Sequence, residues 1–422
     1  MKISNDSRAS GVFEQVECEI EADIYMMKKK MHRYPPSLNA LEERYTVPRY
    51  VAIGPYHHHR VHLRKAEKVK HAAAIRCVRQ SGHLLEELFS AVASFCRHFD
   101  KDVMAGMGDD DFRHMMFFDA CFLVQYMLMQ SGIQIDRSLR GLLGPNRIDI
   151  RHDVMLLENQ LPWEVVETVM MFRSVHLEAF IYKYMRGYLQ DRKFPKETVP
   201  PALNKDNKPP HLLGLLRYYR VGRTSDTIST TVKPKNRTPI SVSAIELAKI
   251  GITLKANKTM NLIDMGLKHK WTLFAELSVA PLDLDRDRAS YLVNMVALEL
   301  CTVKSFSKAP VEDSVVCSYL LLLAMLVNRE EDVQELRARG LLKGRLTNEE
   351  ALHFFTSFQS LRFGPCYNRV MRGIEIYKEN RRMQTKLYAF CYNNKKIIAA
   401  VLTAIGVLVG IIGTLLSIKK SF

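Results

Sequence analysis

The stretch IIAAVLTAIGVLVGIIGTLLSI runs from Ile397 to Ile418 without a charged residue. As a helix that rises about 1.5 Å per residue, it would be roughly 33 Å long, which is enough to cross the hydrocarbon core of a bilayer. A buried core helix is the alternative, but uncharged runs of this length are uncommon in soluble folds. The sequence therefore predicts one transmembrane helix at 397–418.

The charges around this stretch predict its orientation. Six basic residues approach it and two follow it: Lys378, Arg381, Arg382, Lys386, Lys395 and Lys396 before, Lys419 and Lys420 after. Cytoplasmic flanks carry the excess of Lys and Arg, and anionic lipids attract them. The first residues, MKISNDSRAS, are too polar for a signal peptide. We expect a single-pass plasma-membrane protein, anchored by its tail in an anionic leaflet, with a cytosolic body. A body outside the cell is the alternative topology.

The remainder of the chain has the composition of a mainly α-helical globular body. Of the 422 residues 47% are hydrophobic, and only 20 Gly and 16 Pro interrupt them. We expect a polar leader at 1–45 and a single multi-helix body at 46–390. This body carries an exposed, basic, Pro-rich insertion at 191–240. It also carries a small antiparallel β-sheet at 252–285, where apolar and polar residues alternate.

The net charge of +16 would suggest nucleic acid, but its distribution argues against that partner. Residues 191–240 hold eleven Lys or Arg against four acids, and residues 360–396 hold nine against two. The rest of the chain is nearly neutral. The eight cysteines form neither a C-x-x-C pair nor a dense framework, which favours reduced thiols in the cytosol. We therefore expect no nucleic-acid partner.

Two motifs are the most specific features of the body. IGPYHH contains Gly54, Pro55, Tyr56, His57 and His58, and LLENQLP contains Glu158, Asn159 and Gln160. Together with DACFLVQYML at 119–128 and YLVNMVALE at 291–299, they occur in the order found in a large plant family, domain of unknown function 247. The chain resembles this family from residue 15 to residue 418.

The resemblance implies a plant membrane protein with one C-terminal anchor and no established activity. Some grass members of the family are implicated in self-incompatibility. The chain departs from the family pattern at three positions: Ala120 and Gln125 stand where DGCFLLE has Gly and Glu, and His59 replaces the Gly of IGPYHHG. An activity that requires that Glu is not expected in this chain.

Three acids lie on apolar faces of the expected helices. Asp119, Glu158 and Glu299 have mostly apolar neighbours three and four residues away, so each must find a partner or change its pKa. We expect them to join one polar network with Asp153, Asn159, Gln160 and Asn294. The network is either structural, made of caps and interhelical hydrogen bonds, or catalytic. The catalytic candidates for acid–base chemistry are Asp119, Asp153, Glu158 and Glu299.

The histidines of HHHRVH at 57–62 invite comparison with a metal site. Histidines adjacent in sequence point in different directions, however, and no HExxH, C-x-x-C or Asp-rich loop completes a ligand set. The phosphate-binding and acyl-transfer patterns GxxxxGK[ST], GxSxG and GxGxxG are absent too. We expect no metal site and no cofactor.

Two functions from different classes remain. The first is a membrane-anchored, noncatalytic interaction or recognition protein with an unidentified protein partner, linked to self-incompatibility only through the resemblance. The second is an enzyme of unrecognised type that uses the four acids in a shared pocket. Gly406 and Gly410 form a GxxxG step that would allow two anchors to pack as a homodimer, although small residues are common in spans. Sealed and paired acids would favour the interaction protein, and an open pocket would favour the enzyme.

Overall fold

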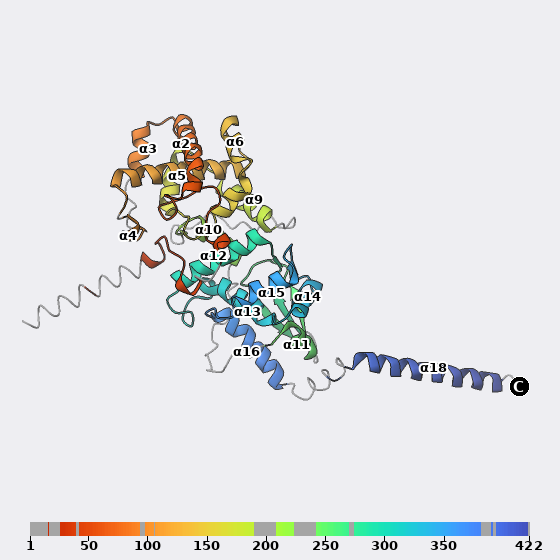
Figure 1. The fold of residues 1–422 in the computed structure, drawn as a ribbon. Coiled ribbons are helices and arrows are strands. Elements are labelled where there is room, and N and C mark those ends of the chain that lie inside the picture. The colour runs from red at the N-terminus through yellow and green to blue at the C-terminus, as the bar shows by residue number, and fades with distance from the viewer. Residues whose placement is uncertain are drawn as a thin grey trace, which may run out of the picture. The chain divides into compact units, whose positions relative to one another are not determined.

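The structure is a computed structural model of the chain, and it describes residues 16, 26–38, 42–92, 98–104, 106–189, 208–222, 242–269, 274–380, 390 and 394–420. Helices dominate and a small mixed sheet accompanies them, which confirms the mainly α-helical class (Figure 1). The chain forms two compact units. The first unit comprises Met1–Arg223 with Asp283–Cys317, and the second comprises Thr224–Leu282 with Ser318–Phe422. Most of the expected leader at 1–45 lies outside the described residues, and the boundaries at 45 and 390 stay predictions.

Helix α5 (Asp109–Gln130) is the core helix of the first unit. It begins with three aspartates, whose charges suit a helix N-terminus, and ends just before Gly132, which has a left-handed φ of +80°. Its side chains from Met115 to Leu128 are almost all buried, as expected of a helix that is apolar on every side. Helices α2 (Glu67–Ser81), α8 (Trp163–Phe172) and α9 (Leu177–Leu189) pack against it.

Shorter elements complete the first unit. They are η1 (Pro36–Leu38), η2 (Glu43–Tyr45), η3 (Val61–Ala66), α3 (Leu85–Ala91), α4 (Lys101–Met104), α6 (Arg137–Leu143), α7 (Arg147–Asp153), α10 (Leu212–Val221), α12 (Arg286–Thr302) and η7 (Val311–Ser314).

Helix α10 shows that part of the insertion expected at 191–240 is not exposed. Residues 212–221 are not exposed, because LLGLLRYYRV brings four leucines to a buried helix face. The side chain of His211 caps this helix by accepting the N–H of Gly214 at 3.2 Å. Residues 190–207 and 223–241 of the insertion lie outside the described residues.

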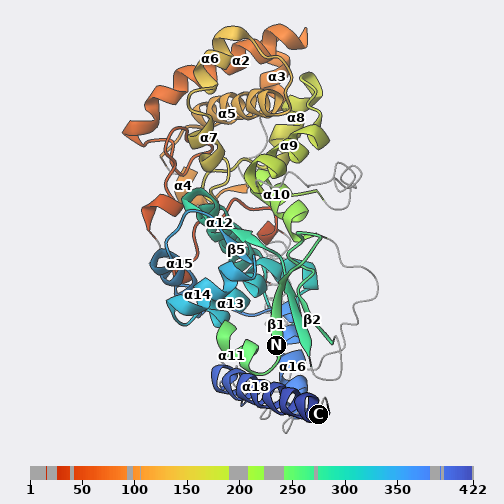
Figure 2. The ribbon, with the colours of Figure 1, turned by 90° about the vertical axis from the view of Figure 1, so that its right-hand side faces the viewer.

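The sheet of the second unit has the order β1-β3-β2 (Figure 2). Strand β1 (Ile252–Ala256) runs parallel to β3 (Ala275–Val279), and β2 (Gly266–His269) runs antiparallel to β3. The small sheet predicted at 252–285 is present, but it is mixed and not antiparallel as expected. Alternation of apolar and polar residues identifies strands but determines neither the neighbour nor the direction of each strand.

Helices cover this small sheet and complete the second unit. Helix α16 (Pro365–Asn380) packs on β2, and a side chain added at Gly373 would come within 3.4 Å of Leu267. The other elements are α11 (Ala244–Lys249), α13 (Val315–Leu326, which starts at the unit boundary), α14 (Glu330–Ala338), α15 (Asn348–Thr356), α18 (Lys395–Lys420) and the paired strands β4 (Leu282–Asp283) and β5 (Leu342–Lys343).

The expected transmembrane segment falls in α18, but a crossing is not established. Over the part of the chain that the structure describes, no single helix is both long and apolar enough to span a membrane. The apolar helix described there is Ile397–Ile411, and the side chains of 412–418 lie outside the described residues. One bent pair, Val311–Leu326 with Glu330–Ala338, meets the length and composition criteria together, with an angle of 115° between its halves.

Candidate functional site

The first unit is organised around an extended segment that runs among helices. Residues 51–53 of the YVAIGPYHH stretch are almost completely inaccessible to solvent. A buried extended backbone must hydrogen-bond its amides to some partner, because an unpaired amide away from water is costly. Here the partners are side chains, and they come from two of the motifs that the sequence singled out.

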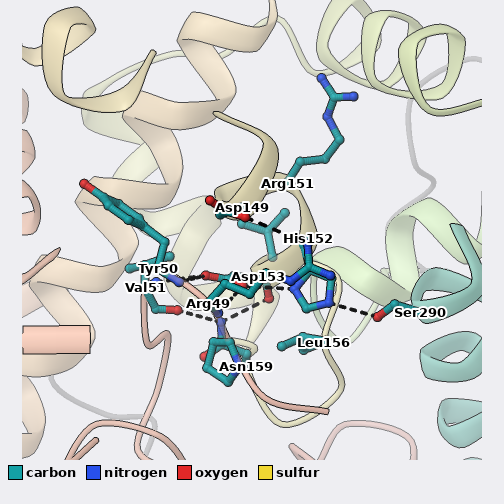
Figure 3. Close-up of polar contacts among 12 residues, drawn as sticks. Arg49, Tyr50, Val51, Asp149, Arg151, His152, Asp153, Leu156, Asn159 and Ser290 are labelled. Carbon is teal, nitrogen blue, oxygen red and sulfur yellow. Dashed lines mark hydrogen bonds and ion pairs between the residues drawn. The ribbon is translucent and has the colours of Figure 1, made fainter. Parts of the chain in front are cut away.

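Asp153, the last residue of α7, binds the start of this segment (Figure 3). Its carboxylate accepts the N–H groups of Arg49 at 2.8 Å, Tyr50 at 2.7 Å and Val51 at 2.8 Å. The Nδ1 atom of His152 lies 3.1 Å from the same carboxylate. Bonds to a charged acceptor are stronger than neutral ones, so one fully buried aspartate anchors three consecutive amides.

Asn159 and Asp119 continue the same row of acceptors. Asn159 accepts the N–H of Ile53 at 2.7 Å and donates to the carbonyl of Val51 at 3.0 Å, as a neighbouring strand would. Asp119 of α5 then accepts the N–H of Gly54 at 2.8 Å. The structure thus brings together three of the predicted network residues along one backbone segment.

Gly54 is the turn at the end of the segment. Its φ of +76° lies in the left-handed region, and an added Cβ would stand 2.8 Å from the carbonyl oxygen of Gln160. Both features require glycine. This close approach brings the IGPYHH motif directly against the LLENQLP motif.

Lys70 is a buried cation that the sequence did not reveal. Its ammonium lies 2.6 Å from Asp119 and 2.8 Å from Glu67, and its side chain has no exposed surface. Burial alone would lower the pKa of Lys70, but the two carboxylates outweigh this effect and raise that pKa. A signal was present, since Lys70 shares the buried face of α2 with Val69, Ala73 and Cys77.

Asn294 of α12 connects a second group of buried polar atoms. Its Oδ1 accepts the N–H of Leu157 at 2.6 Å and the hydroxyl of Tyr34. Its Nδ2 donates to the carbonyls of Tyr45 at 3.0 Å and Ser290 at 2.7 Å. This amide therefore ties three separate stretches of the first unit together.

Glu158 lies at the edge of this group. It accepts the N–H of Tyr34 at 2.8 Å, and its side chain is 21% exposed. Burial raises the pKa of Glu158. The Nε2 atom of His57 is 3.7 Å from its carboxylate, and burial, together with Arg60 and His62, lowers the pKa of His57 to about 4.

Gln160 and Tyr56 support the loops on either side. Gln160 donates to the carbonyls of Val154 and Leu156, both at 2.8 Å, and accepts the N–H of Leu213 at 3.0 Å. Tyr56, which follows Pro55, donates its hydroxyl to the carbonyl of Met31 at 2.7 Å. All of these bonds fix the backbone of the neighbouring loops.

Glu299 stands apart from the other acids. Its carboxylate accepts the N–H groups of Val316 at 2.9 Å and Cys317 at 2.7 Å, at the start of α13, and it is paired with Arg217. This is the arrangement of a side chain that neutralises free amides and the positive end of a helix. The sequence predicted a single network. The structure instead has one group around Asp153, Asn159 and Asp119, a second around Asn294 and Glu158, and Glu299 as a separate helix cap.

Two hollows stand out among the described residues of the first unit, and none of the four candidate acids lines either of these two. One has a volume of about 440 Å³ and is mostly apolar, with Ile75, Val78, Leu85, Phe89, Phe117 and Phe118 in its walls. The other, about 470 Å³, has a mixed lining, with charged or polar residues (His58, His59, Arg64, Glu67, His71, Asp111 and His114) beside Met107, Met115 and Phe118. Both contain His114 and Phe118, so we name the two together the α2 groove. Within the described residues, no group of three or more His, Cys, Asp or Glu is placed to hold a metal ion.

A family model described as a plant protein of unknown function, DUF247, matches residues 31–409. The chain belongs to this family. A UPF0481 protein of Arabidopsis thaliana is 23% identical over 382 residues, which cover 82% of this chain and 76% of that relative. No solved structure matches the chain.

The match confirms the resemblance that the motifs predicted. In this DUF247 chain the two most specific motifs, IGPYHH and LLENQLP, face each other in the buried core of the first unit. The two motifs fit each other closely, because Asn159 of LLENQLP accepts the N–H of Ile53 and the carbonyl of Gln160 leaves room only for glycine at position 54.

Proposed function

We propose that this DUF247 chain is a noncatalytic, membrane-attached interaction protein. One observation carries the proposal: three of the four candidate acids, all except the partly exposed Glu158, bind backbone amides and cations in the core instead of lining a hollow. Asp119, Asp153 and Glu299 are fully buried, and each carboxylate is occupied by two or more partners. A catalytic carboxylate must reach its substrate within hydrogen-bond distance, and these acids have no such access.

The membrane attachment rests on the chemistry of α18. Its described apolar side chains are exposed in successive turns, with Ile397, Leu402 and Val409 each more than 60% accessible. A run of exposed apolar residues on all sides of a helix is unfavourable in water and favourable in a bilayer. The sequence extends this run to Ile418, and Lys395 and Lys396 stand where an anionic leaflet would attract them.

A flotation experiment tests the attachment. The full chain, expressed in plant cells, is expected to float with membranes after a carbonate wash. The double substitution Leu402→Glu and Leu408→Glu should move it to the soluble fraction, because each charge at the centre of a span costs about 3 kcal/mol. The matched control is Val61→Glu with Ile148→Glu, which changes equally exposed apolar residues on the body. Equal flotation of all three chains would contradict the proposal.

Orientation is a separate question with its own test. The proposed topology places the body in the cytosol, so protease added to sealed microsomes should digest it. Protection of the body, or a glycan at Asn236 or Asn257, would reverse the assignment.

The same anchor offers a face for self-association. Side chains added at Gly406 and Gly410 would meet no atom within 4 Å, so a second helix is free to approach there. A two-hybrid assay in membranes should show a weaker signal for Gly406→Ile than for the native anchor. An equal signal would remove the homodimer.

A further inference from the structure

Two cysteines meet where α2 packs against α5. Cys77 of α2 and Cys121 of α5 are both fully buried, and both are free thiols. The thiol of Cys77 donates to the carbonyl of Cys121 at 3.7 Å, and the two thiols are hydrogen-bonded to each other. Their small neighbours Ala73 and Ala120 are buried as well, which lets the two helices approach closely at this point. The two sulfur atoms therefore lie within reach of one another, which is the first requirement for a disulfide.

The surroundings of Cys77 favour its thiolate. The side-chain amide of Gln125 donates to the Cys77 sulfur at 3.4 Å, and Arg173 places a positive charge near it. The buried Nε of Arg173 has no hydrogen-bond partner among the described residues. Hydrogen-bond donors and a nearby cation are the features that activate reactive cysteines.

The two thiols differ in acidity. The hydrogen bond from Cys121 lowers the pKa of Cys77 most, and burial opposes this effect. Gln125 and Arg173 add to the lowering, so the pKa of Cys77 falls below its ordinary value. The same hydrogen bond, together with burial, raises the pKa of Cys121 well above its ordinary value. Since the thiolate is the nucleophile in thiol chemistry, Cys77 is the attacking residue of the pair and Cys121 the resolving residue.

A hollow brings small reagents close to the pair. The apolar hollow of the α2 groove has Ala74 of α2 and Phe118 of α5 in its walls. Each of them lies three residues before the cysteine of its helix, which corresponds to about 4.5 Å of helical rise. A reagent of two heavy atoms therefore has less than one helical turn to cross, whereas a molecule of peptide size does not fit between packed helices.

We propose that Cys77 and Cys121 form a modification site, at which hydrogen peroxide converts two thiols into one disulfide. The Cys77 thiolate attacks a peroxide oxygen, so that an S–O bond forms, the O–O bond breaks, and the departing hydroxide takes up the proton that Cys77 released. The sulfur of Cys121 then attacks the sulfenic acid of Cys77. The S–S bond forms, the S–O bond breaks, and the hydroxyl leaves as water with the proton of Cys121.

The reaction balances and has a structural consequence. The two thiols together lose two electrons, and one peroxide is reduced to two waters. The disulfide joins α2 to α5 across 44 positions of sequence and fixes two walls of the α2 groove against each other. Disulfides of cytosolic proteins are mostly transient and serve catalysis or redox sensing, which fits a pair that is reduced at rest.

Mass spectrometry of the oxidised full chain tests the site. The protein in detergent is treated with hydrogen peroxide, catalase removes the excess, and free thiols are alkylated only after unfolding. A peptide that links Cys77 to Cys121 is expected in monomeric protein, and dithiothreitol should abolish it. Cys317 is the control, because it is equally buried but lies against the Glu299 carboxylate, and it should stay reduced. Recovery of both cysteines as alkylated thiols, or links only between two chains, would overturn the proposal.

Single substitutions assign the two roles. In Cys121→Ser the resolving thiol is missing, so the sulfenic acid of Cys77 should accumulate and be trapped by dimedone. In Cys77→Ser the thiol of Cys121 should stay reduced, because its pKa is raised. Dimedone labelling of Cys121 in the second variant, without labelling of Cys77 in the first, would contradict the proposed order of attack.

The charge of Arg173 offers a finer test. Arg173→Gln should slow disulfide formation about threefold, because a thiol pKa higher by about one unit lowers the thiolate fraction about tenfold while the more basic thiolate regains part of the loss. Arg79→Gln, an exposed position on the helix of Cys77, should leave the rate unchanged. Equal rates in both variants would contradict the activation of Cys77 by Arg173.

Thermal unfolding shows whether the link belongs to the native fold. The oxidised chain should melt about 5–10 °C higher than the reduced chain, since the disulfide constrains the unfolded state, and dithiothreitol should reverse the shift. The same treatment of Cys121→Ser should give no rise. A lower melting temperature of the linked form would mean that the bond forms only in a distorted chain, and would overturn the proposal.

Discussion

The two units stabilise extended backbone in opposite ways. In the second unit β1, β2 and β3 satisfy one another through a main-chain ladder. In the first unit the segment from Arg49 to Gly54 is surrounded by helices, and Asp153, Asn159 and Asp119 accept its amides. A ladder does not depend on the identity of any one side chain, whereas this row of acceptors does. Substitutions should therefore be far more damaging in the first unit than in the sheet.

Removal of Asp153 should have the largest effect. Asp153→Ala leaves three consecutive amides without this acceptor, one of them fully buried and two partly buried, and we expect it to lower the free energy of unfolding by about 3–5 kcal/mol. Denaturant unfolding of the full chain in detergent measures the change. The control is Asp149→Ala, four residues earlier, whose carboxylate is 46% exposed and 3.8 Å from Arg49. It should cost at most about 1 kcal/mol. Equal losses would show that the segment does not rely on Asp153.

The second-largest effect on the stability of the first unit should come from lowering the pH. The pKa of His57 falls from its ordinary 6.5 to about 4 on folding, and burial and His32 lower the pKa of His211 to about 3. As the pH falls, these histidines take up protons more readily in the unfolded chain than in the folded one. The free energy of unfolding is therefore at its full value above pH 6.5 and declines as the pH falls from 6.5 to 4. For His57 the decline amounts to about 3 kcal/mol by pH 4.

Substitution of His57 tests the origin of this decline. His57→Gln should flatten the pH dependence between 6.5 and 4, while His83→Gln, at a surface position that is 51% exposed, should leave it unchanged. An unaltered slope in the His57 variant would assign the acid sensitivity to other groups.

Two glycines offer a third, finer comparison. Gly54 and Gly82 have nearly the same left-handed φ, +76° and +73°, but only an added Cβ at Gly54 meets a neighbour, the carbonyl of Gln160. Gly82→Ala should cost about 1 kcal/mol for backbone strain alone. Gly54→Ala should cost about 2–3 kcal/mol, because a steric clash adds to that strain. Thermal unfolding of both variants gives the difference, and equal melting temperatures would mean that the loop at Gln160 yields.

The sequence predicted the helices better than their connections. Composition predicted the mainly helical class, and apolar neighbours identified Asp119 and Glu299 as buried. The partners of the acids were beyond reach, because they are distant in sequence: the amides of residues 49–51 meet Asp153 across about a hundred positions, and the amide of Gly54 meets Asp119 across 65. Lys70 was missed although it shares the apolar face of α2, because its carboxylate partner Asp119 lies on another helix. The parallel pairing of β1 with β3 depends on strand order, which alternation does not encode.

The smallest effect should come from the sheet itself. Glu276 of β3 lies opposite Lys268 of β2, and its carboxylate is 3.1 Å from Lys255 of β1, whose side chain is 50% exposed. Glu276→Ala removes these charge contacts but leaves the main-chain ladder in place, because the ladder uses only amides and carbonyls. We expect a loss of about 0.5–1 kcal/mol, the range for cross-strand pairs, since the Glu276 side chain is 12% exposed but its partner Lys255 stays half in solvent. Denaturant unfolding under the conditions used for Asp153→Ala measures it. If Glu276→Ala instead cost as much as Asp153→Ala, the contrast between a backbone ladder and a row of side-chain acceptors would fail.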